Sequence, residues 1–506
     1  MRTKHSFKNA IYSFVKTFII TILAFFARKI FVNVLSSYYL GLQGLFTNLI
    51  SMLSLAELGI GTAITFSLYE PIAKGNKEKI KALMQFYKKA YYIIAGVIFS
   101  SGFVLSFFLD YIVKESERGS GYLQLVFILF LLNTSITYLF SYKRTLIKAD
   151  QKQYKLVPYL TGFRVVLIVA QSIILILTHN FILYLLTRII VTVFENIAIN
   201  RYINKKYKFI NEDLTKDLPT EEKKLIKTNV KAMFFHKIGG YVINSTDNII
   251  ISTFINVSTV GLYSNYLLII NTVKKFLTKM FNSMTASFGN LIANKVQKKS
   301  ISVFNEFLFL SFLIFNWATV SLFTLINPFI NLWLGSQYLI EQNIINILLI
   351  NFFLIGMRVP LSVVKTSGGI FVQDKYAPLI ESVINLSISI VLVKKIGLLG
   401  VFIGTLTSSI LVPFWYKPYI VYKYIFDISV FYYFKQIIKY ILVLLVNILL
   451  VNYIKNNWIY KINFINFIYN ILICMILPNF VTLFIFRNNE NFQKVKQRIL
   501  NILKKG

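Results

Sequence analysis

The sequence has a single cysteine, Cys474, and only three histidines among its 506 residues. One cysteine cannot form an intramolecular disulfide framework, nor can it supply a metal site built from several cysteine ligands. His5, His179 and His236 are not grouped, so they indicate neither a metal site nor a catalytic centre. We therefore predict that the protein binds no metal and no cofactor.

Charged residues are also scarce, at 15% of the chain, whereas hydrophobic residues make up 56%. A soluble globular domain carries about 25% charged residues, so this composition indicates a polytopic membrane protein. The chain has no Walker motif, which excludes ATP as an energy source bound by the chain itself. No small-residue cleavage site follows the first apolar run, so this run is expected to be a membrane span and not a signal peptide.

Acidic residues are the scarcest charged class: 20 Asp and Glu stand against 54 Lys and Arg, for a net charge of +34. The basic residues lie mainly in short segments between apolar runs, which speaks against a nucleic-acid partner. Residues 201–231 contain nine of them, whereas residues 327–341 contain none. Because Lys and Arg collect in cytoplasmic loops, the alternation predicts that both termini are cytoplasmic.

Apolar runs of about 20 residues, the length that crosses a bilayer, recur along the whole chain. We predict an all-α polytopic membrane protein with about fourteen transmembrane helices. The predicted spans are residues 17–35, 41–67, 90–113, 122–142, 156–178, 181–200, 232–255, 260–292, 302–326, 342–364, 377–393, 398–421, 437–454 and 463–486. The first two form a helical hairpin with a bend at 36–39.

Two pairs of similar segments predict an internal duplication. GLFTNLI at 44–50 matches GLYSNYL at 261–267, and QKQYKLVP at 151–158 matches QDKYAP at 373–378. Because six spans separate equivalent helices, the two repeats would be parallel and would enclose a central cleft. The predicted domains are an N-terminal six-helix bundle at 1–208, a cytoplasmic linker at 209–231, a C-terminal six-helix bundle at 232–426, and helices 13 and 14 with an amphipathic tail at 427–506.

Two cytoplasmic segments have the apolar spacing of surface helices that lie on the inner leaflet. One is residues 74–89, and the other is the tail that begins at Arg487. Their apolar faces would be formed by Ile80, Leu83, Met84 and Tyr87 in the first segment and by Val495, Ile499, Ile502 and Leu503 in the second.

The predicted spans contain more basic than acidic residues, although a charge at the centre of a bilayer costs at least about 2.5 kcal/mol. Charges that only paired with each other would balance in sign, so a surplus of cations in a cavity suits a phosphate or pyrophosphate. The predicted substrate-binding residues are Arg28, Arg164, Arg188, Lys274, Lys275 and Arg358. Since neighbours on a helix point about 100° apart, one each of Arg28 and Lys29 and of Lys274 and Lys275 would face the cavity.

Other charged residues in the spans have simpler interpretations. Long side chains can extend to the membrane surface, which is the expectation for Lys237, Lys279, Glu195 and Glu381. Asp247, in the polar run NSTDN at 244–248, and Glu57 are candidates for binding a coupling Na⁺ or H⁺. An internal ion pair is the alternative for both carboxylates.

The chain resembles the Wzx-type flippases, the polysaccharide-exporting branch of the multidrug/oligosaccharidyl-lipid/polysaccharide (MOP) superfamily. The resemblance covers most of residues 8–426. It is based on two six-helix halves plus two helices, on an Arg in the first span, and on two loose hydrophobic patterns. These are YYLGLQGLFTNLISMLSLAELGIGTAI at 38–64 and GLYSNYLLIINTV at 261–273.

This resemblance implies that an undecaprenyl-diphosphate-linked oligosaccharide is moved across the bacterial inner membrane by alternating access. By analogy with lipid II flippases, Arg28 and either Lys274 or Lys275 would contact the diphosphate. Spans 13 and 14 would offer a groove for the lipid tail, and polysaccharide assembly proteins are candidate partners beside membrane lipids. The second span has no Arg, only Glu57, which favours a capsule, O-antigen or teichoic repeat unit over the peptidoglycan precursor.

Three other functions compete with a flippase. A drug/cation antiporter of the same superfamily would need acidic and aromatic cavity residues, and the cationic surplus argues against it. A polysaccharide polymerase or glycosyltransferase would need a catalytic outer loop, but the longest outer segment, 327–341, has no paired carboxylates. An amino-acid permease would show discontinuous helices, which are not evident. We therefore predict a transporter and not an enzyme.

Overall fold

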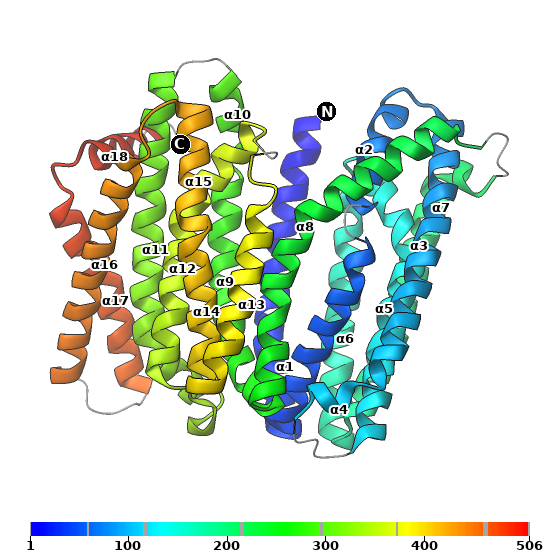
Figure 1. Ribbon diagram of the computed structural model, residues 1–506, viewed down its shortest axis with the longest axis horizontal. Helices are drawn as coiled ribbons and strands as arrows, with labels where there is room; N and C mark the ends of the chain where they lie inside the picture. Colours follow the sequence, from blue (N-terminus) through cyan, green and yellow to red (C-terminus); the bar gives the residue numbers. More distant parts are fainter. Residues whose placement is uncertain are drawn as a thin grey trace. The chain divides into compact units, whose positions relative to one another are not determined.

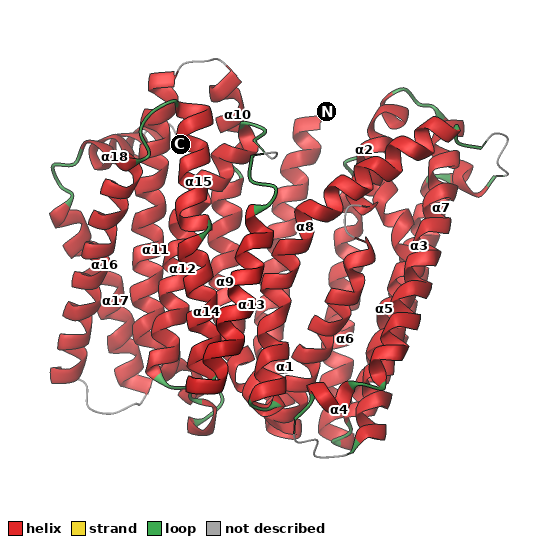
Figure 2. Ribbon diagram, in the orientation of Figure 1, coloured by secondary structure: helices red, strands yellow, loops and turns green. Residues whose placement is uncertain are grey.

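The computed structural model describes residues 2–57, 60–114, 119–212, 217–293, 297–370, 373–458 and 464–503. These residues form helices joined by short loops, with no strand among them (Figure 2). The chain divides into two compact units, Met1–Gly261 (unit 1) and Leu262–Gly506 (unit 2).

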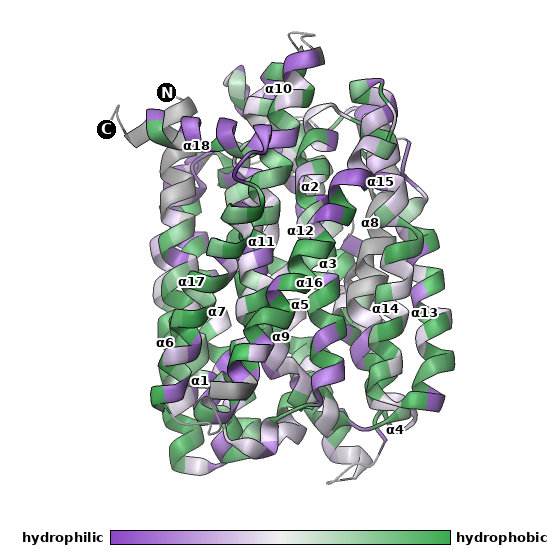
Figure 3. Ribbon diagram, turned by 90° about the vertical axis from the view of Figure 1, so that its left-hand side faces the viewer, coloured by the Kyte–Doolittle hydropathy of each residue, from purple (hydrophilic) through white to green (hydrophobic). Residues whose placement is uncertain are grey.

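Ten helices in the described part of the chain are long and apolar enough to cross a membrane. They are Phe14–Leu53, Lys77–Ser106, Ser120–Ala149, Gln153–Thr178, Phe181–Lys206, Lys298–Trp333, Gln342–Ser367, Leu398–Phe426, Phe431–Lys455 and Phe464–Ile485. Figure 3 shows mainly hydrophobic residues along the middle of the long helices. The prediction of an all-helical, multi-pass membrane protein is confirmed, whereas the number of fourteen spans stays a prediction.

Unit 1 contains the N-terminal helices through α8 and the first turn of α9. Its elements are α1 (Arg2–Leu53), η1 (Ser54–Glu57), α2 (Ile60–Ala73), α3 (Lys77–Ser106), α4 (Leu109–Ile112), α5 (Ser120–Ala149), η2 (Gln153–Leu156), α6 (Val157–Thr178), α7 (Phe181–Lys206), η3 (Lys208–Asn211), α8 (Thr220–Phe254) and the start of α9 (Val257–Asn282).

Helix α1 changes direction sharply at Ser36, inside the predicted bend (Figure 1). Ser36 has φ 84° and ψ 173°, a conformation that non-glycine residues rarely adopt. The two arms of α1 therefore hold the predicted first span and the beginning of the second. The second span is not one helix, because α1 ends at Leu53 and η1 and α2 follow.

The last helix of unit 1, α8, packs against α1 and α2. The contacts thus place the unit boundary at Gly261, after α8, and residues 220–231 of the predicted linker belong to this helix. Gly41 of α1 lies so close to Val257 that an added Cβ would be 1.9 Å from its carbonyl oxygen. Gly261 approaches the Ser37 carbonyl oxygen equally closely, so the backbones of α1 and the start of α9 touch.

The predicted surface helix at 74–89 is wrong, because most of this segment is the first part of the long helix α3. Its apolar side chains do not face the membrane surface. They are buried in a cluster with Leu146 of α5, with Leu218, which precedes α8, and with Ile226 of α8. The four side chains are Ile80, Leu83, Met84 and Tyr87. An apolar face at helical spacing looks the same in a sequence whether it covers a lipid surface or a neighbouring helix.

Unit 2 contains the rest of α9 and the elements through the C-terminal helix. These are α10 (Thr285–Ala293), α11 (Gln297–Trp333), η4 (Ser336–Tyr338), α12 (Gln342–Ser367), α13 (Ala377–Ile396), α14 (Leu398–Leu411), α15 (Pro413–Val421), the π-helical turn η5 (Tyr422–Phe426), α16 (Phe431–Trp458), α17 (Phe464–Ile485) and α18 (Glu490–Leu503).

Helices α16 and α17, the predicted spans 13 and 14, are fixed to α11 by a buried polar group. Thr482 of α17 accepts hydrogen bonds from Asn316 of α11, at 3.1 Å, and from Asn447 of α16, at 3.0 Å. Hydrogen bonds of this kind join helices inside a bilayer, where water offers no alternative partner. The two helices thus belong to the body of unit 2.

Helix α18 lies against α11 and is amphipathic, as the tail pattern predicts. Arg498 contacts the buried Glu306 of α11 at 2.5 Å, and Lys494 donates to Ser302 at 3.0 Å. Val495 is buried, whereas the side chains of Ile499, Ile502 and Leu503 lie outside the described residues.

Candidate functional site

Three of the predicted substrate-binding arginines come together in unit 1. Arg28 of α1, Arg164 of α6 and Arg188 of α7 all interact electrostatically with Tyr184 of α7. Arg164 and Arg188 are also close enough to repel each other. Guanidinium groups from three helices are therefore within electrostatic range of one phenol, and we call these four residues the arginine cluster.

The arginine cluster is placed by the packing of α6 against α1 and α7. The Tyr184 ring contacts Phe31 of α1 edge-on, with centroids 5.2 Å apart, and stacks on Phe181 at 5.9 Å. Gln171 of α6 donates a hydrogen bond to the Tyr184 carbonyl oxygen at 3.0 Å. Each of the three helices is thus tied to Tyr184 by a contact of its own.

Two of the arginines lie at a similar depth. Arg28 precedes the turn at Ser36 by eight residues, and Arg188 follows the start of α7 at Phe181 by seven. At 1.5 Å per residue they are about 12 and 10 Å from this end of their helices. Arg164 lies 14 residues before the end of α6 at Thr178 and is the exposed member, whereas Arg28 and Arg188 are half-buried.

Two of these arginines have no acidic partner among the described residues. In the part of the chain that the structure describes, neither Arg164 nor Arg188 forms an ion pair with a carboxylate. Arg188 instead lies over the Phe130 ring, with its guanidinium carbon 5.6 Å from the centroid. Guanidinium groups in a low-dielectric region require a counter-charge, and their planar donors match the oxygens of a phosphate.

The predicted lysines Lys274 and Lys275 belong to unit 2, in α9. Lys274 is half-buried and Lys275 is exposed, and the two interact with each other electrostatically. Within the described residues neither has an ion pair with an acidic side chain. Lys279 is exposed, and the side chain of Lys237 lies outside the described residues.

Arg358 points into the interior of unit 2. Only 7% of it is exposed, and its two terminal nitrogens donate to the Ser409 carbonyl at 3.1 Å and to the Ser409 hydroxyl at 2.8 Å. Glu381 of α13 is its acidic neighbour. These contacts hold α12 against α14, so they supply a structural role for Arg358 beside the predicted role in substrate binding.

Glu57 is surrounded by tyrosines. Tyr138 of α5 donates to its Oε2 at 2.7 Å, and Tyr91 of α3 donates to its Oε1 at 3.3 Å. The absence of a side chain at Gly61 leaves space for this contact, because a Cβ there would be 3.3 Å from the Tyr91 hydroxyl. Within the described residues Glu57 has no basic partner in an ion pair.

Asp247 is half-buried on α8, which packs against α1. The residues before it, Ser245 and Thr246, are almost fully buried, and the Ser245 carbonyl accepts a hydrogen bond from Asn48 of α1 at 3.3 Å. The polar run at 244–248 is therefore part of the contact between α8 and α1.

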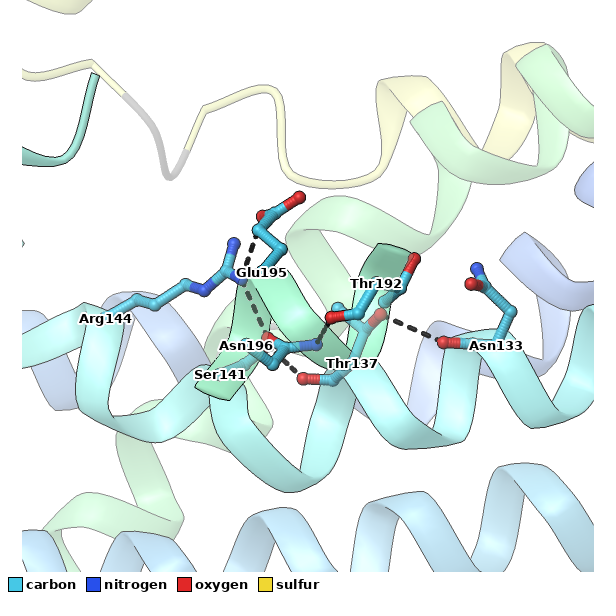
Figure 4. Close-up of polar contacts among 7 residues, drawn as sticks. All are labelled: Asn133, Thr137, Ser141, Arg144, Thr192, Glu195 and Asn196. Atoms are coloured by element: carbon cyan, nitrogen blue, oxygen red, sulfur yellow. Dashed lines mark hydrogen bonds and ion pairs between the residues drawn. The ribbon is translucent and has the colours of Figure 1, made fainter. Parts of the chain in front are cut away.

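Glu195 has a structural partner that the sequence pattern did not identify. Arg144 of α5 forms an ion pair with Glu195 at 3.0 Å and donates to Asn196 at 2.7 Å (Figure 4). Both side chains are about three-quarters buried. The pair joins α5 to α7, so the expectation that Glu195 simply extends to the membrane surface is wrong.

Tyr184, Tyr91 and Tyr138 are the main site residues that sequence reasoning missed. Tyrosines are frequent in this chain, with 31 copies, and an aromatic residue in an apolar run is normally taken for packing. The signal that identifies these three is the charged group each one contacts, and this is visible only in the folded chain.

No protein-family model matches the chain, and no curated protein matches its sequence. Among solved structures, lipid II flippase MurJ in an inward closed conformation is similar with a TM-score of 0.67 and 16% identity, over 94% of this chain and 99% of MurJ. An inward-facing multidrug resistance MATE family transporter of the MOP superfamily gives 0.64 and 16% identity, over 79% and 95%. A MOP superfamily transporter from Pyrococcus furiosus gives 0.53 and 14% identity, over 81% and 93%.

At such low sequence identities, the structural similarity establishes the fold and not the substrate. All three structures are of transporters, and the similarity extends over nearly the whole of each one. The chain therefore has the fold of MOP superfamily transporters.

Proposed function

We propose that this protein is a flippase that moves an undecaprenyl-diphosphate-linked oligosaccharide, of the capsule or O-antigen type, across the bacterial cytoplasmic membrane. The arginine cluster is the observation that carries the proposal. It offers guanidinium groups from three helices within one membrane unit, and those of Arg164 and Arg188 have no carboxylate partner among the described residues. A diphosphate would provide the negative charge and the acceptor oxygens that Arg164 and Arg188 lack.

The fold supports a lipid-linked substrate. The similarity to the lipid II flippase extends over 94% of this chain, whereas the MATE transporter covers 79%. Alternating access would expose the arginine cluster first to one leaflet and then to the other, and Lys274 and Lys275 of unit 2 are proposed as further contacts. The C-terminal helices α16 and α17 are proposed to accommodate the lipid tail.

The second candidate function is a drug/cation antiporter, and the Glu57 site favours it. A carboxylate that accepts two phenol hydrogen bonds and has no basic partner can attract a cation. In an antiporter this cation would be the transported substrate, whereas in the proposed flippase it would be the coupling Na⁺ or H⁺, with Asp247 as the other candidate for the coupling site. The Pyrococcus furiosus transporter has a binding pocket of reversed polarity, which shows that pocket charge varies among proteins with this fold.

The proposal predicts that the arginines determine affinity for a diphosphate. Replacing Arg188 or Arg28 with Gln removes charged hydrogen bonds worth about 1.5–3 kcal/mol, which weakens binding about 10- to 150-fold. Arg188→Lys should recover part of this loss, because an ammonium keeps the charge but not the bidentate geometry. The measurement is the Kd of undecaprenyl diphosphate for the purified full-length protein.

The matched control is Arg487→Gln, which removes an exposed arginine from unit 2. It should bind like the wild type. In cells, the Arg28 and Arg188 variants should insert normally into the membrane but lower the amount of surface glycan. Wild-type affinity in both the Arg28→Gln and Arg188→Gln variants would refute the proposal.

A further inference from the structure

Four tyrosines gather near the ends of α1, α6 and α7 that lie away from Ser36, Thr178 and Phe181. They are Tyr12 of α1, Tyr154 of η2, Tyr159 of α6 and Tyr202 of α7, which we call the tyrosine platform. The ring centroids of Tyr12 and Tyr154 are 6.1 Å apart, and those of Tyr159 and Tyr202 are 5.3 Å apart. Tyr202 also interacts electrostatically with Tyr154, so the two pairs are adjacent.

The tyrosine platform combines exposed faces with a firm base. Tyr12 is 43% exposed and Tyr159 is 37% exposed, while Tyr154 and Tyr202 are half-buried. Tyr202 packs on a buried cluster formed by Ile147 of α5, Leu156, and two residues of α7, Ile199 and Ile203. The rings are therefore held in place and still present area to a ligand.

A cation borders the platform. Lys152 interacts electrostatically with Tyr202 and forms an ion pair with Asp150 at 2.8 Å. Asp150 also accepts a hydrogen bond from Tyr207 at 2.5 Å. Burial, and then this hydrogen bond, raises the pKa of the Tyr207 phenol, so Tyr207 stays protonated and remains a donor at neutral pH. With two donors already bound to Asp150, this carboxylate does not repel an anion strongly.

Tyrosines are common at membrane surfaces, where they form aromatic belts. A belt explains isolated rings, but it does not require that rings from α1, η2, α6 and α7 meet in pairs. The platform and the arginine cluster lie at neighbouring depths: on α6, Arg164 follows Tyr159 by five residues, or about 7.5 Å along the helix axis. Arg164 in turn interacts with Tyr184.

We propose that the tyrosine platform binds the sugar rings of the lipid-linked saccharide before its diphosphate reaches the arginine cluster. This inference rests on the proposed function and assigns the saccharide a site of its own. The apolar C–H face of a pyranose can stack on an aromatic ring, and the phenol hydroxyls can exchange hydrogen bonds with the sugar hydroxyls. Tyrosine offers this contact area with little loss of side-chain entropy, and Lys152 attracts the adjoining phosphate.

The test compares two probes, undecaprenyl diphosphate and undecaprenyl-diphosphate-N-acetylglucosamine, for binding to the purified full-length protein. In the wild type the sugar should lower the Kd about fivefold or more, as expected for stacking on aromatic rings. The double variant Tyr159→Ala/Tyr202→Ala should lose this sugar-dependent gain and keep the wild-type Kd for undecaprenyl diphosphate.

Two further variants make the test specific. Tyr159→Phe/Tyr202→Phe keeps the ring faces and should retain most of the gain, whereas a loss as complete as with Ala would overturn stacking. Tyr432→Ala removes an exposed tyrosine of unit 2 and should retain the whole gain. Equal Kd values for the two probes in the wild type, or a gain that survives in the Ala variant, would overturn the inference. Failure of the proposed function would give a different result from failure of this inference. In that case Arg188→Gln would leave the Kd of both probes unchanged.

Discussion

At the scale of single residues, an arginine in an apolar run has two different outcomes in this protein. Arg188 lies beside Tyr184 without an acidic partner in an ion pair among the described residues, whereas Arg358 is turned inward and bonded to Ser409. The sequence predicts that both lie in the membrane, because the surrounding apolar runs are unambiguous. It could not predict where the side chains point, since this depends on how each helix is rotated by its neighbours.

Glu57 is the residue that we expect to bind the coupling cation. Glu57→Gln removes the carboxylate charge, so transport should lose its response to an imposed Na⁺ or H⁺ gradient. Tyr138→Phe removes a hydroxyl that competes with the cation for Oε2, so the response should persist at about tenfold lower cation concentration. The measurement is lipid translocation in proteoliposomes with imposed gradients. If Glu57→Gln responds like the wild type and Asp247→Asn does not, the coupling site is Asp247.

At the scale of elements, the apolar runs predicted helices well because a 20-residue apolar run has few alternatives in a bilayer. The duplication suggested by GLFTNLI and GLYSNYL stays a prediction, because Gly261 lies at a close backbone contact whereas a Cβ at its counterpart Gly44 would have ordinary contacts at 3.5 Å. The interpretation of the amphipathic pattern at 74–89 as a surface helix was wrong, because an amphipathic segment has more than one possible environment. Its apolar face fits either a lipid surface or a helix bundle, and only the positions of α5 and α8 decide between them.

The close contact between α1 and the start of α9 should make the stability of the protein sensitive to a side chain at Gly41. Gly41→Ala would place a Cβ 1.9 Å from the Val257 carbonyl oxygen, and a backbone atom cannot move aside as a side chain can. Overpacking of this kind costs about 1–3 kcal/mol, so the unfolding temperature in detergent should fall. Gly96→Ala on α3 is the matched control, because no atom lies within 4 Å of its added Cβ. Equal unfolding temperatures for the two variants would show that the helices can separate freely at Gly41.

At the scale of the whole molecule, orientation follows from the uneven distribution of basic residues. The 54 Lys and Arg are concentrated in alternate connecting segments, while residues 327–341 have none. Loops rich in Lys and Arg stay on the cytoplasmic side, which would place η4 outside and α18 inside. In unit 1 the same rule would place the basic segment 201–231, and with it the end of α7 that carries Tyr202, on the cytoplasmic side, at the leaflet where lipid-linked saccharides are assembled.

Cysteine labelling can test this orientation with little background, because the single native cysteine, Cys474, is buried. Ser336 of η4 and Gln497 of α18 are both exposed, so each can be replaced with cysteine. In spheroplasts a membrane-impermeant maleimide should label Ser336→Cys directly, but Gln497→Cys only after the membrane is permeabilised. The reverse labelling pattern would mean that η4 is cytoplasmic and α18 is outside. That pattern would place the C-terminal tail outside and contradict the predicted cytoplasmic C-terminus.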